Sequence, residues 1–256
     1  MQSQSTGSGG ALMFYVFFTT IYYILKYNFV SKDIYKESNS NANETSGRIL
    51  FGIYIVLIII GEFFINLSLS TAMCKDSQTG TALITTLIPW CAIYGLISML
   101  LNMFPGWLKP FSNTFGYFFT YWFDIQKVFL DSLKEGKKPS EIALLKEDPK
   151  LLINELPFEL DKFKQVVKQI GKFTEDKDKM NDLFNLVMIK KTVAEYIWYI
   201  LIGSLVTSIS YNYVVNSTCE SSVDSMKKIH KQYMQDETKK MDDEQQQPST
   251  SYVVTD

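Results

Sequence analysis

One carboxylate and several neutral polar side chains interrupt otherwise apolar stretches of this chain. Glu62 is the only acid well inside such a stretch, and Asn66 lies one helical turn further along the same face. Thr207 and Ser208 reach a similar depth in a later stretch. An ionisable group surrounded by apolar residues at such depth indicates a functional site by default. We expect Glu62, Asn66, Thr207 and Ser208 to form an intramembrane polar cluster.

Two roles for Glu62 follow from this placement. A structural role, in which the carboxyl forms hydrogen bonds between helices, needs only polar neighbours. A proton or ion path would also need a second acid or a cationic partner at the same depth, and the sequence offers none: Lys26 sits near the end of its apolar stretch, where its side chain can reach the membrane surface. The structural role is favoured, and a small channel or transporter using Glu62 is the alternative.

Other kinds of chemistry find no support in the sequence. His230 is the only histidine, and the three cysteines form no CxxC pair. Motifs of the phosphate-loop, HExxH and GxSxG types are missing from the sequence. We therefore expect no catalytic residue, no metal and no cofactor, and not an enzyme. The net charge is -2 and Arg48 is the only arginine, which argues against nucleic-acid binding because phosphates and bases favour the guanidinium fork.

Four apolar blocks must position these residues. A helix needs about 20 mostly apolar residues to cross a bilayer, and the blocks that meet this length span approximately 11–30, 49–70, 83–104 and 193–215. Tyr and Trp concentrate toward several ends of these blocks, as interfacial aromatic belts do. The sequence therefore predicts an all-α integral membrane protein with four transmembrane helices.

The distribution of basic residues predicts the orientation. Fifteen lysines fall between Lys109 and Lys191, whereas Lys75 is the only basic residue of the 71–82 loop. Because basic residues favour the cytosolic side, we expect loops 31–48 and 105–192 to be cytosolic and both termini to be lumenal.

Two sequence features test this orientation. Cys74 and Cys219 follow the second and fourth spans, so both would face the lumen, where they either form a disulfide or remain two unrelated thiols. Cys91, inside the third span, is most simply a small packing residue. Asn216 begins a glycosylation sequon on the same side, although it lies too close to the membrane for efficient modification.

The segment 105–124 raises the question of a fifth crossing. Its uninterrupted apolar part, Phe115 to Phe123, would extend roughly 14 Å as a helix, about half the hydrocarbon thickness. We therefore predict an aromatic helix lying at the membrane interface, capped by Ser112 or Thr114; a re-entrant half-helix is the alternative. Four residues combine an apolar body with a polar tip and are the expected membrane-interface anchors: Trp107, Tyr117, Tyr121 and Trp122.

The chain thus divides into four parts. Residues 1–123 hold three transmembrane helices and the interfacial segment, 124–192 a helical soluble insert, 193–218 the fourth transmembrane helix, and 219–256 a polar, partly disordered tail. Within the insert, Pro139 and Ser140 predict a helix start, and apolar residues at helical spacing over 158–170 predict a buried face. The run from 177 predicts a helix continuing into the fourth span.

Residues 83–117 contain Leu83-Ile84-Thr85-Thr86, Pro89-Trp90, Pro105-Gly106-Trp107 and Phe111-Ser112-Asn113-Thr114-Phe115-Gly116-Tyr117. On these residues the segment resembles multi-pass membrane proteins of large icosahedral DNA viruses of the mimivirus and phycodnavirus kind. Virions of this kind carry a lipid membrane beneath the capsid. The resemblance implies a virion membrane protein, a minor capsid component that ties the shell to the bilayer, and it brings no catalytic residues.

These considerations predict a structural membrane protein. We expect it in the internal virion membrane, which derives from the endoplasmic reticulum during assembly. Its expected partners are the lipid bilayer and capsid or other virion membrane proteins, and a homo-oligomer is a further possibility. A host-membrane remodelling factor that acts only during assembly is a third alternative, beside the structural protein and the channel.

Overall fold

The computed structural model describes residues 3–36, 40–134, 149–217, 219 and 223–245. Within these residues the chain is helical, with no β-strand and a single isolated bridge between Leu133 and Phe173. The α-helices are α1 (Ser3–Lys26), α2 (Ser40–Cys74), α3 (Thr79–Pro89), α4 (Gly95–Met103), α5 (Lys109–Phe111), α6 (Tyr117–Tyr121), α7 (Ile125–Asp131), α9 (Pro149–Glu155), α10 (Leu160–Ile170), α11 (Lys177–Asn216) and α12 (Val223–Gln245). Short π-helical turns η1 (Tyr27–Ser31), η2 (Trp90–Tyr94) and η4 (Ser112–Gly116), and the 3-10 turn η3 (Pro105–Leu108), connect several of them.

Four segments are long and apolar enough to cross a membrane, as the sequence predicted. They are Gly9–Ser31, Thr45–Cys74, Thr79–Met103 and Lys177–Asn216, the third being α3, η2 and α4 in line. Large apolar side chains on their outer faces are exposed, including Met13, Phe17, Ile53, Phe64, Ile84, Leu96, Met99, Leu201 and Leu205. A perimeter of this kind suits lipid rather than water.

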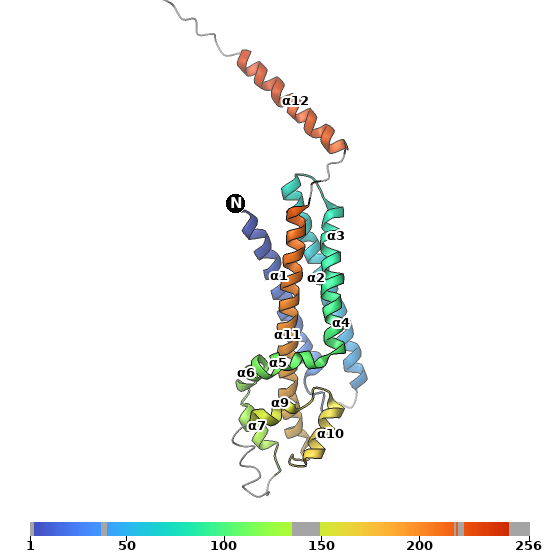
Figure 1. Cartoon of the computed structure of the whole chain (residues 1–256), viewed down its shortest axis with the longest axis vertical. Helices are drawn as coiled ribbons and strands as arrows, with labels where there is room; N and C mark the ends of the chain where they lie inside the picture. The colour runs from blue at the N-terminus through green and yellow to red at the C-terminus, as the bar shows by residue number, and fades with distance from the viewer. Residues whose placement is uncertain (1–2, 37–39, 135–148, 218, 220–222, 246–256) are drawn as a thin grey trace, which may run out of the picture.

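The four segments pack side by side into a bundle (Figure 1). α1 contacts α11 and α2, and α3 contacts α2 and α11. The N-terminal end of α1, the α2–α3 turn and the end of α11 lie toward one end of the bundle, where α12 projects away from it (Figure 1). The insert helices α7, α9 and α10 gather at the opposite end (Figure 1), so the start of α1 and the whole of α12 lie on one side of the bundle and these insert helices on the other.

The insert forms its own hydrophobic core around the N-terminal half of α11. Phe163 of α10 and Phe129 of α7 are fully buried against this half, which contributes Leu183 and Phe184. The predicted buried face of residues 158–170 is confirmed, since its other apolar residues pack on the same core. α11 continues without interruption from this core into the bundle, which confirms the predicted junction. The predicted helix start at Pro139 and Ser140 lies outside the described residues.

The segment after α4 turns across the end of the bundle. Pro105 begins a series of helical turns that runs to Tyr121, and α5 and α6 lie transverse to α4 and α11 (Figure 1). This is the direction expected for a helix lying along a membrane surface. The predicted cap is wrong: the helical path begins at Pro105, so Thr114 lies inside it and donates its hydroxyl to the carbonyl of Pro110 at 2.7 Å. Ser112 is also inside the path and is buried.

Candidate functional site

Polar side chains from three helices meet inside the bundle. Glu62 and Asn66 are one turn apart on α2, Thr86 is on α3, and Thr207 and Ser210 are on α11. All five side chains are buried. The separation of four residues places Glu62 and Asn66 on one face of α2, where both meet α11. We call these five residues the polar cluster.

Asn66 is the centre of the best hydrogen-bonded part of the polar cluster. Its side-chain amide donates to Thr86 Oγ1 at 2.7 Å and to Ser210 Oγ at 2.8 Å. Ser210 Oγ in turn donates to the backbone oxygen of Thr85 at 2.8 Å. One hydroxyl of α11 therefore couples α2 and α3.

The carbonyl of Thr85 is the one that Pro89 deprives of a helical donor. Proline has no N–H, so the carbonyl four residues before it loses its usual partner, and the π-helical turn η2 follows directly after Pro89. Membrane helices accept such a break where a neighbouring side chain replaces the lost hydrogen bond. Ser210 provides that replacement, so the polar cluster and the break in the third segment belong together.

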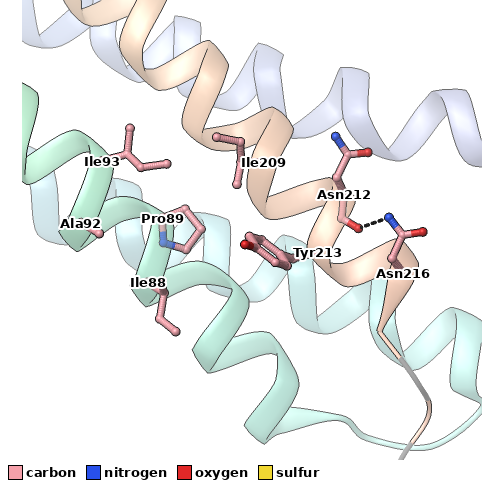
Figure 2. A pocket seen from close by; sticks show the side chains of 8 residues that line it. All are labelled: Ile88, Pro89, Ala92, Ile93, Ile209, Asn212, Tyr213 and Asn216. Carbon is pink, nitrogen blue, oxygen red and sulfur yellow. Dashed lines mark hydrogen bonds between the residues drawn. The ribbon is translucent and has the colours of Figure 1, made fainter.

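A groove of about 500 Å³ lies beside this break (Figure 2). Its walls are largely apolar, with Ile88, Pro89 and Ile93 on one side and Ile209 and Tyr213 of α11 on the other. Figure 2 shows the Tyr213 ring between α11 and the Pro89 side. The groove is open to the outer surface of the bundle, and its lining does not include Glu62.

Glu62 itself is only partly satisfied. Thr207 Oγ1 donates to Glu62 Oε1 across 3.4 Å, a long hydrogen bond, while Oε2 is buried and has no hydrogen-bond partner among the described residues. Within the same residues, no cluster of His, Cys, Asp or Glu could hold a metal ion. The geometry suits a carboxyl that holds α2 to α11 by one hydrogen bond.

The structure changes the membership of the predicted cluster. It brings Glu62, Asn66 and Thr207 together, but Ser208 is exposed and donates to the carbonyl of Ser204 on its own helix at 2.7 Å. Ser208 points away because it is one residue, about 100° of rotation, from Thr207. Thr86 and Ser210 were missed. The sequence contained one indication of Ser210: Pro89 leaves the carbonyl of Thr85 without its helical donor, so a hydroxyl from a neighbouring helix is needed there.

A second buried polar group consists of tyrosines. Tyr15 donates its hydroxyl to the carbonyl of Tyr199, and Tyr54 lies 2.9 Å from the Thr19 hydroxyl and 3.4 Å from the Tyr94 hydroxyl. All four tyrosines are buried in the bundle core. These residues are therefore not part of an exposed interfacial belt: they lie in the core, and the hydroxyl groups of Tyr15, Tyr54 and Tyr94 have partners inside the protein.

The expected membrane-interface anchors divide into two kinds. Tyr121 and Trp122 are 69% and 71% exposed and can meet a membrane surface. Trp107 is partly exposed, but it stacks on Trp198, whose ring N–H donates to the Trp107 carbonyl at 2.9 Å. Tyr117 packs against the insert core, with Lys150 Nζ 5.5 Å from its ring centre. Two of the four anchors thus also hold the interfacial segment on the protein.

The interfacial segment touches α11 through backbone atoms. A Cβ added at Gly116 would lie 2.8 Å from the carbonyl oxygen of Lys190 and 3.0 Å from its Cα. Lys190 is 1% exposed, and its ammonium donates to Asn154 Oδ1 at 2.5 Å, to Asn113 Oδ1 at 3.3 Å and to the Ile153 carbonyl at 3.4 Å. Three acceptors match the three N–H groups of the ammonium. This lysine joins α11, the interfacial segment and α9.

The loop after the first span is also fastened to α11. Asp33 accepts hydrogen bonds from the side-chain amides of Asn181 at 2.7 Å and Asn185 at 3.1 Å, and its own N–H donates to Asn185 at 3.0 Å. The hydrogen bond from Asn181, and then that from Asn185, lower the pKa of the Asp33 carboxyl below its ordinary 3.8. Lys36 adds an ion pair with Asp178 at 2.7 Å. The first loop and the insert therefore form one unit.

The opposite end of the bundle holds the predicted cysteine pair. Cys74 at the end of α2 and Cys219 after α11 form a disulfide, with their Cα atoms 5.4 Å apart. Cys91 is a free, exposed thiol. The side-chain amide of Asn216, the atom that would carry a glycan, donates to the carbonyl of Asn212 at 2.9 Å, as Figure 2 shows. Thr218, the third sequon residue, lies outside the described residues, and glycosylation stays a prediction.

Comparisons of this chain with protein-family models, with curated proteins and with solved structures give no significant match. The function must therefore be argued from the sequence and from the geometry of the bundle and its insert.

Proposed function

We propose that this chain is a structural membrane protein of a large DNA virus, which anchors and organises the internal virion membrane beneath the capsid shell. The four apolar segments support membrane insertion. The resemblance of residues 83–117 to virion membrane proteins supports the viral setting. In this proposal the protein is a minor capsid component, and the groups described above hold its helices together without acting as a catalytic site.

The observation that carries the anchoring role is the continuity of α11. This helix has 40 residues and is about 60 Å long at 1.5 Å per residue, twice the thickness of a bilayer core. Its first half is the centre of the insert core, and its second half is a bundle helix. A load applied to the insert would pass into the bundle along one unbroken helix.

The fastening of the insert supports the same role. Lys190 joins three elements at the base of the bundle, and Asp33 ties the first loop to α11. A flexibly linked domain would need neither contact. The insert is therefore the surface best suited to bind a capsid protein or another membrane protein, while α12 offers a second surface at the other end of the molecule.

The alternative of a channel or transporter depends on Glu62. The buried Oε2 atom without a partner is the observation that favours it. Against it, within the described residues the polar cluster supplies Glu62 with no ion pair, and Thr207 engages the other oxygen. Purified protein in liposomes decides: ion or proton flux that is lost in Glu62→Gln would establish the alternative, and equal permeability of protein-containing and empty liposomes would remove it.

Purified virions test the proposed function. We expect the protein in intact particles at many copies, released with the lipid fraction by detergent. Protease applied to membranes of infected cells should cut the 124–192 insert on the side that faces the shell, with the 71–82 loop protected. If the protein is abundant in infected-cell membranes but missing from purified particles, the structural proposal fails and a host-membrane remodelling factor replaces it.

A further inference from the structure

A cavity of about 590 Å³ lies where the bundle meets the insert. It is bordered by the C-terminal ends of α1 and α4, by the N-terminal part of α2, by η3 at the start of the interfacial segment, and by α11. Its size is within the range of small-molecule sites. It lies at the ends of the candidate spans, where the chain leaves α4 and turns across the end of the bundle. In a membrane-inserted bundle this is the level of the lipid headgroups.

The charged part of the lining is arranged around the half-buried carboxylate of Glu195. Glu195 forms two ion pairs: its Oε2 lies 2.5 Å from Lys26 Nζ, and its Oε1 lies 3.8 Å from Lys191 Nζ. Arg48 and Glu159 also line the cavity. Three basic groups against two carboxylates leave a net positive charge of one, so the lining favours an anionic group.

The remaining walls are apolar. Phe51 of α2, Leu101 of α4 and Leu108 of η3 line the cavity, and the two leucines are buried. A free inorganic anion would make no use of these walls, whereas an acyl chain would cover them. A site with basic groups beside apolar walls, at headgroup depth, selects a ligand that has both an anionic head and an apolar chain.

We infer that this cavity binds one anionic phospholipid, with its phosphate at Lys26, Lys191 and Arg48 and the start of its acyl chains along Phe51 and Leu101. The inference depends on membrane insertion, which is part of the proposed function, but on neither the virion nor the capsid. The bound lipid would fill the junction between the bundle and the interfacial segment. The protein would then collect acidic lipids at the membrane face that carries the insert.

The test uses the full-length protein purified in mild detergent, with bound lipids counted by native mass spectrometry. The added lipids are phosphatidylglycerol and phosphatidylcholine, which have a phosphodiester in common but differ in net charge. We expect one phosphatidylglycerol to bind more tightly than phosphatidylcholine. Inorganic phosphate is the third ligand, and we expect it to displace no lipid.

Two variants probe the cavity and one serves as the control. Arg48→Gln should weaken phosphatidylglycerol binding about fivefold, the factor that corresponds to ~1 kcal/mol for one basic residue near an anionic membrane surface. Asn102→Trp keeps every charge but fills the cavity that Asn102 lines, and should abolish the bound lipid. Lys127→Gln removes an exposed charge of α7 outside the cavity and should leave binding unchanged.

Several results would overturn the inference. Equal binding of the two phospholipids, or an equal loss in Lys127→Gln and Arg48→Gln, would mean general surface attraction. Undiminished binding in Asn102→Trp, with an unaltered melting temperature, would place the lipid elsewhere. Displacement of the lipid by phosphate would assign the site to a free anion. Protein that incorporates stably into nanodiscs yet shows no lipid preference defeats this inference alone, while failure to incorporate defeats the proposed function.

Discussion

The contact between Gly116 and α11 allows a sharp test of how the interfacial segment is held. In Gly116→Ala the added Cβ would lie 2.8 Å from the Lys190 carbonyl oxygen and 3.0 Å from Lys190 Cα. Both atoms belong to the backbone of a long helix, so neither can rotate away. Gly106, in η3 of the same segment, has no atom within 4 Å of an added Cβ and is the matched control.

The expected magnitude follows from comparing the two variants. Replacing a helical glycine by alanine gains about 0.5–1 kcal/mol at either position, because alanine loses less backbone entropy on folding. Only Gly116→Ala also forces two backbones apart, and overpacking of this kind costs about 1–3 kcal/mol. Both variants share the entropic gain, so it cancels when their changes in the free energy of unfolding are compared. Gly116→Ala should therefore be less stable than Gly106→Ala by about 1–3 kcal/mol. By the scaling of globular domains this lowers its melting temperature by about 2–12 °C relative to the control.

Thermal unfolding in detergent, followed by circular dichroism, measures this difference. Limited proteolysis at a temperature below both transitions adds a local measure, since a displaced segment should be cut faster after its aromatic residues. Equal melting temperatures and equal cleavage rates for the two alanine variants would refute the reasoning. The interfacial segment would then be held by the membrane alone, without packing on α11.

Three further predictions concern the polar cluster, the first loop and the cysteines. Ser210→Ala should destabilise the bundle by about 1–2 kcal/mol, because it leaves the buried carbonyl of Thr85 unpaired. Ser208→Ala, at an exposed position on the same helix, should change stability by less than about 0.5 kcal/mol. Chemical unfolding in detergent compares the two variants, and equal effects would contradict the hydrogen-bond assignment. The lowered pKa of Asp33 means that its stabilisation is present above the unfolded pKa and is lost as the pH falls through the folded pKa. Asp33→Asn should therefore melt below wild type at pH 7, and the difference in melting temperature should begin to shrink below about pH 4 and vanish once the pH is below the folded pKa. A difference that persists in stronger acid would point to another cause. Maleimide labelling of the denatured, unreduced protein should modify Cys91 alone, and all three cysteines after reduction; Cys74→Ser should expose Cys219 without reduction, and full labelling before reduction would exclude the disulfide.

The elements of the fold were largely predictable because each depends on a property of contiguous sequence. A span needs about 20 apolar residues in a row, and the four blocks supply them. The apolar stripe of α10 and the uninterrupted run that forms the 40-residue helix α11 are likewise local patterns. The interfacial segment was also indicated by local chemistry, since two prolines and an apolar limit of about nine residues leave too little for a crossing. Its starting point was missed because Pro105 itself begins the helical path.

Contacts between helices were harder to predict, because the rotation of each helix about its axis is set by its neighbours. Thr207 faces Glu62 while the adjacent Ser208 faces outward, and no single-sequence pattern separates them. The role of Ser210, in contrast, could have been predicted from the sequence. A proline within a span implies one carbonyl without a donor, and a search for a hydroxyl at matching depth would have included this residue.

The same physics limits what a buried polar residue can say about function. Apolar side chains gain nothing by leaving lipid for another helix, so helices in a membrane associate through close packing and through hydrogen bonds between polar residues. A carboxyl such as Glu62 is therefore compatible with a purely structural bundle, and its presence alone does not distinguish a channel from an anchor. Its surroundings favour the proposed structural role: a transport site needs groups that exchange partners along a path, whereas Asn66, Ser210 and the carbonyl freed by Pro89 form hydrogen bonds that satisfy one another. Glu62 lies at the edge of this set with one oxygen engaged by a long hydrogen bond. For this reason Glu62→Gln should destabilise the bundle less than Ser210→Ala does.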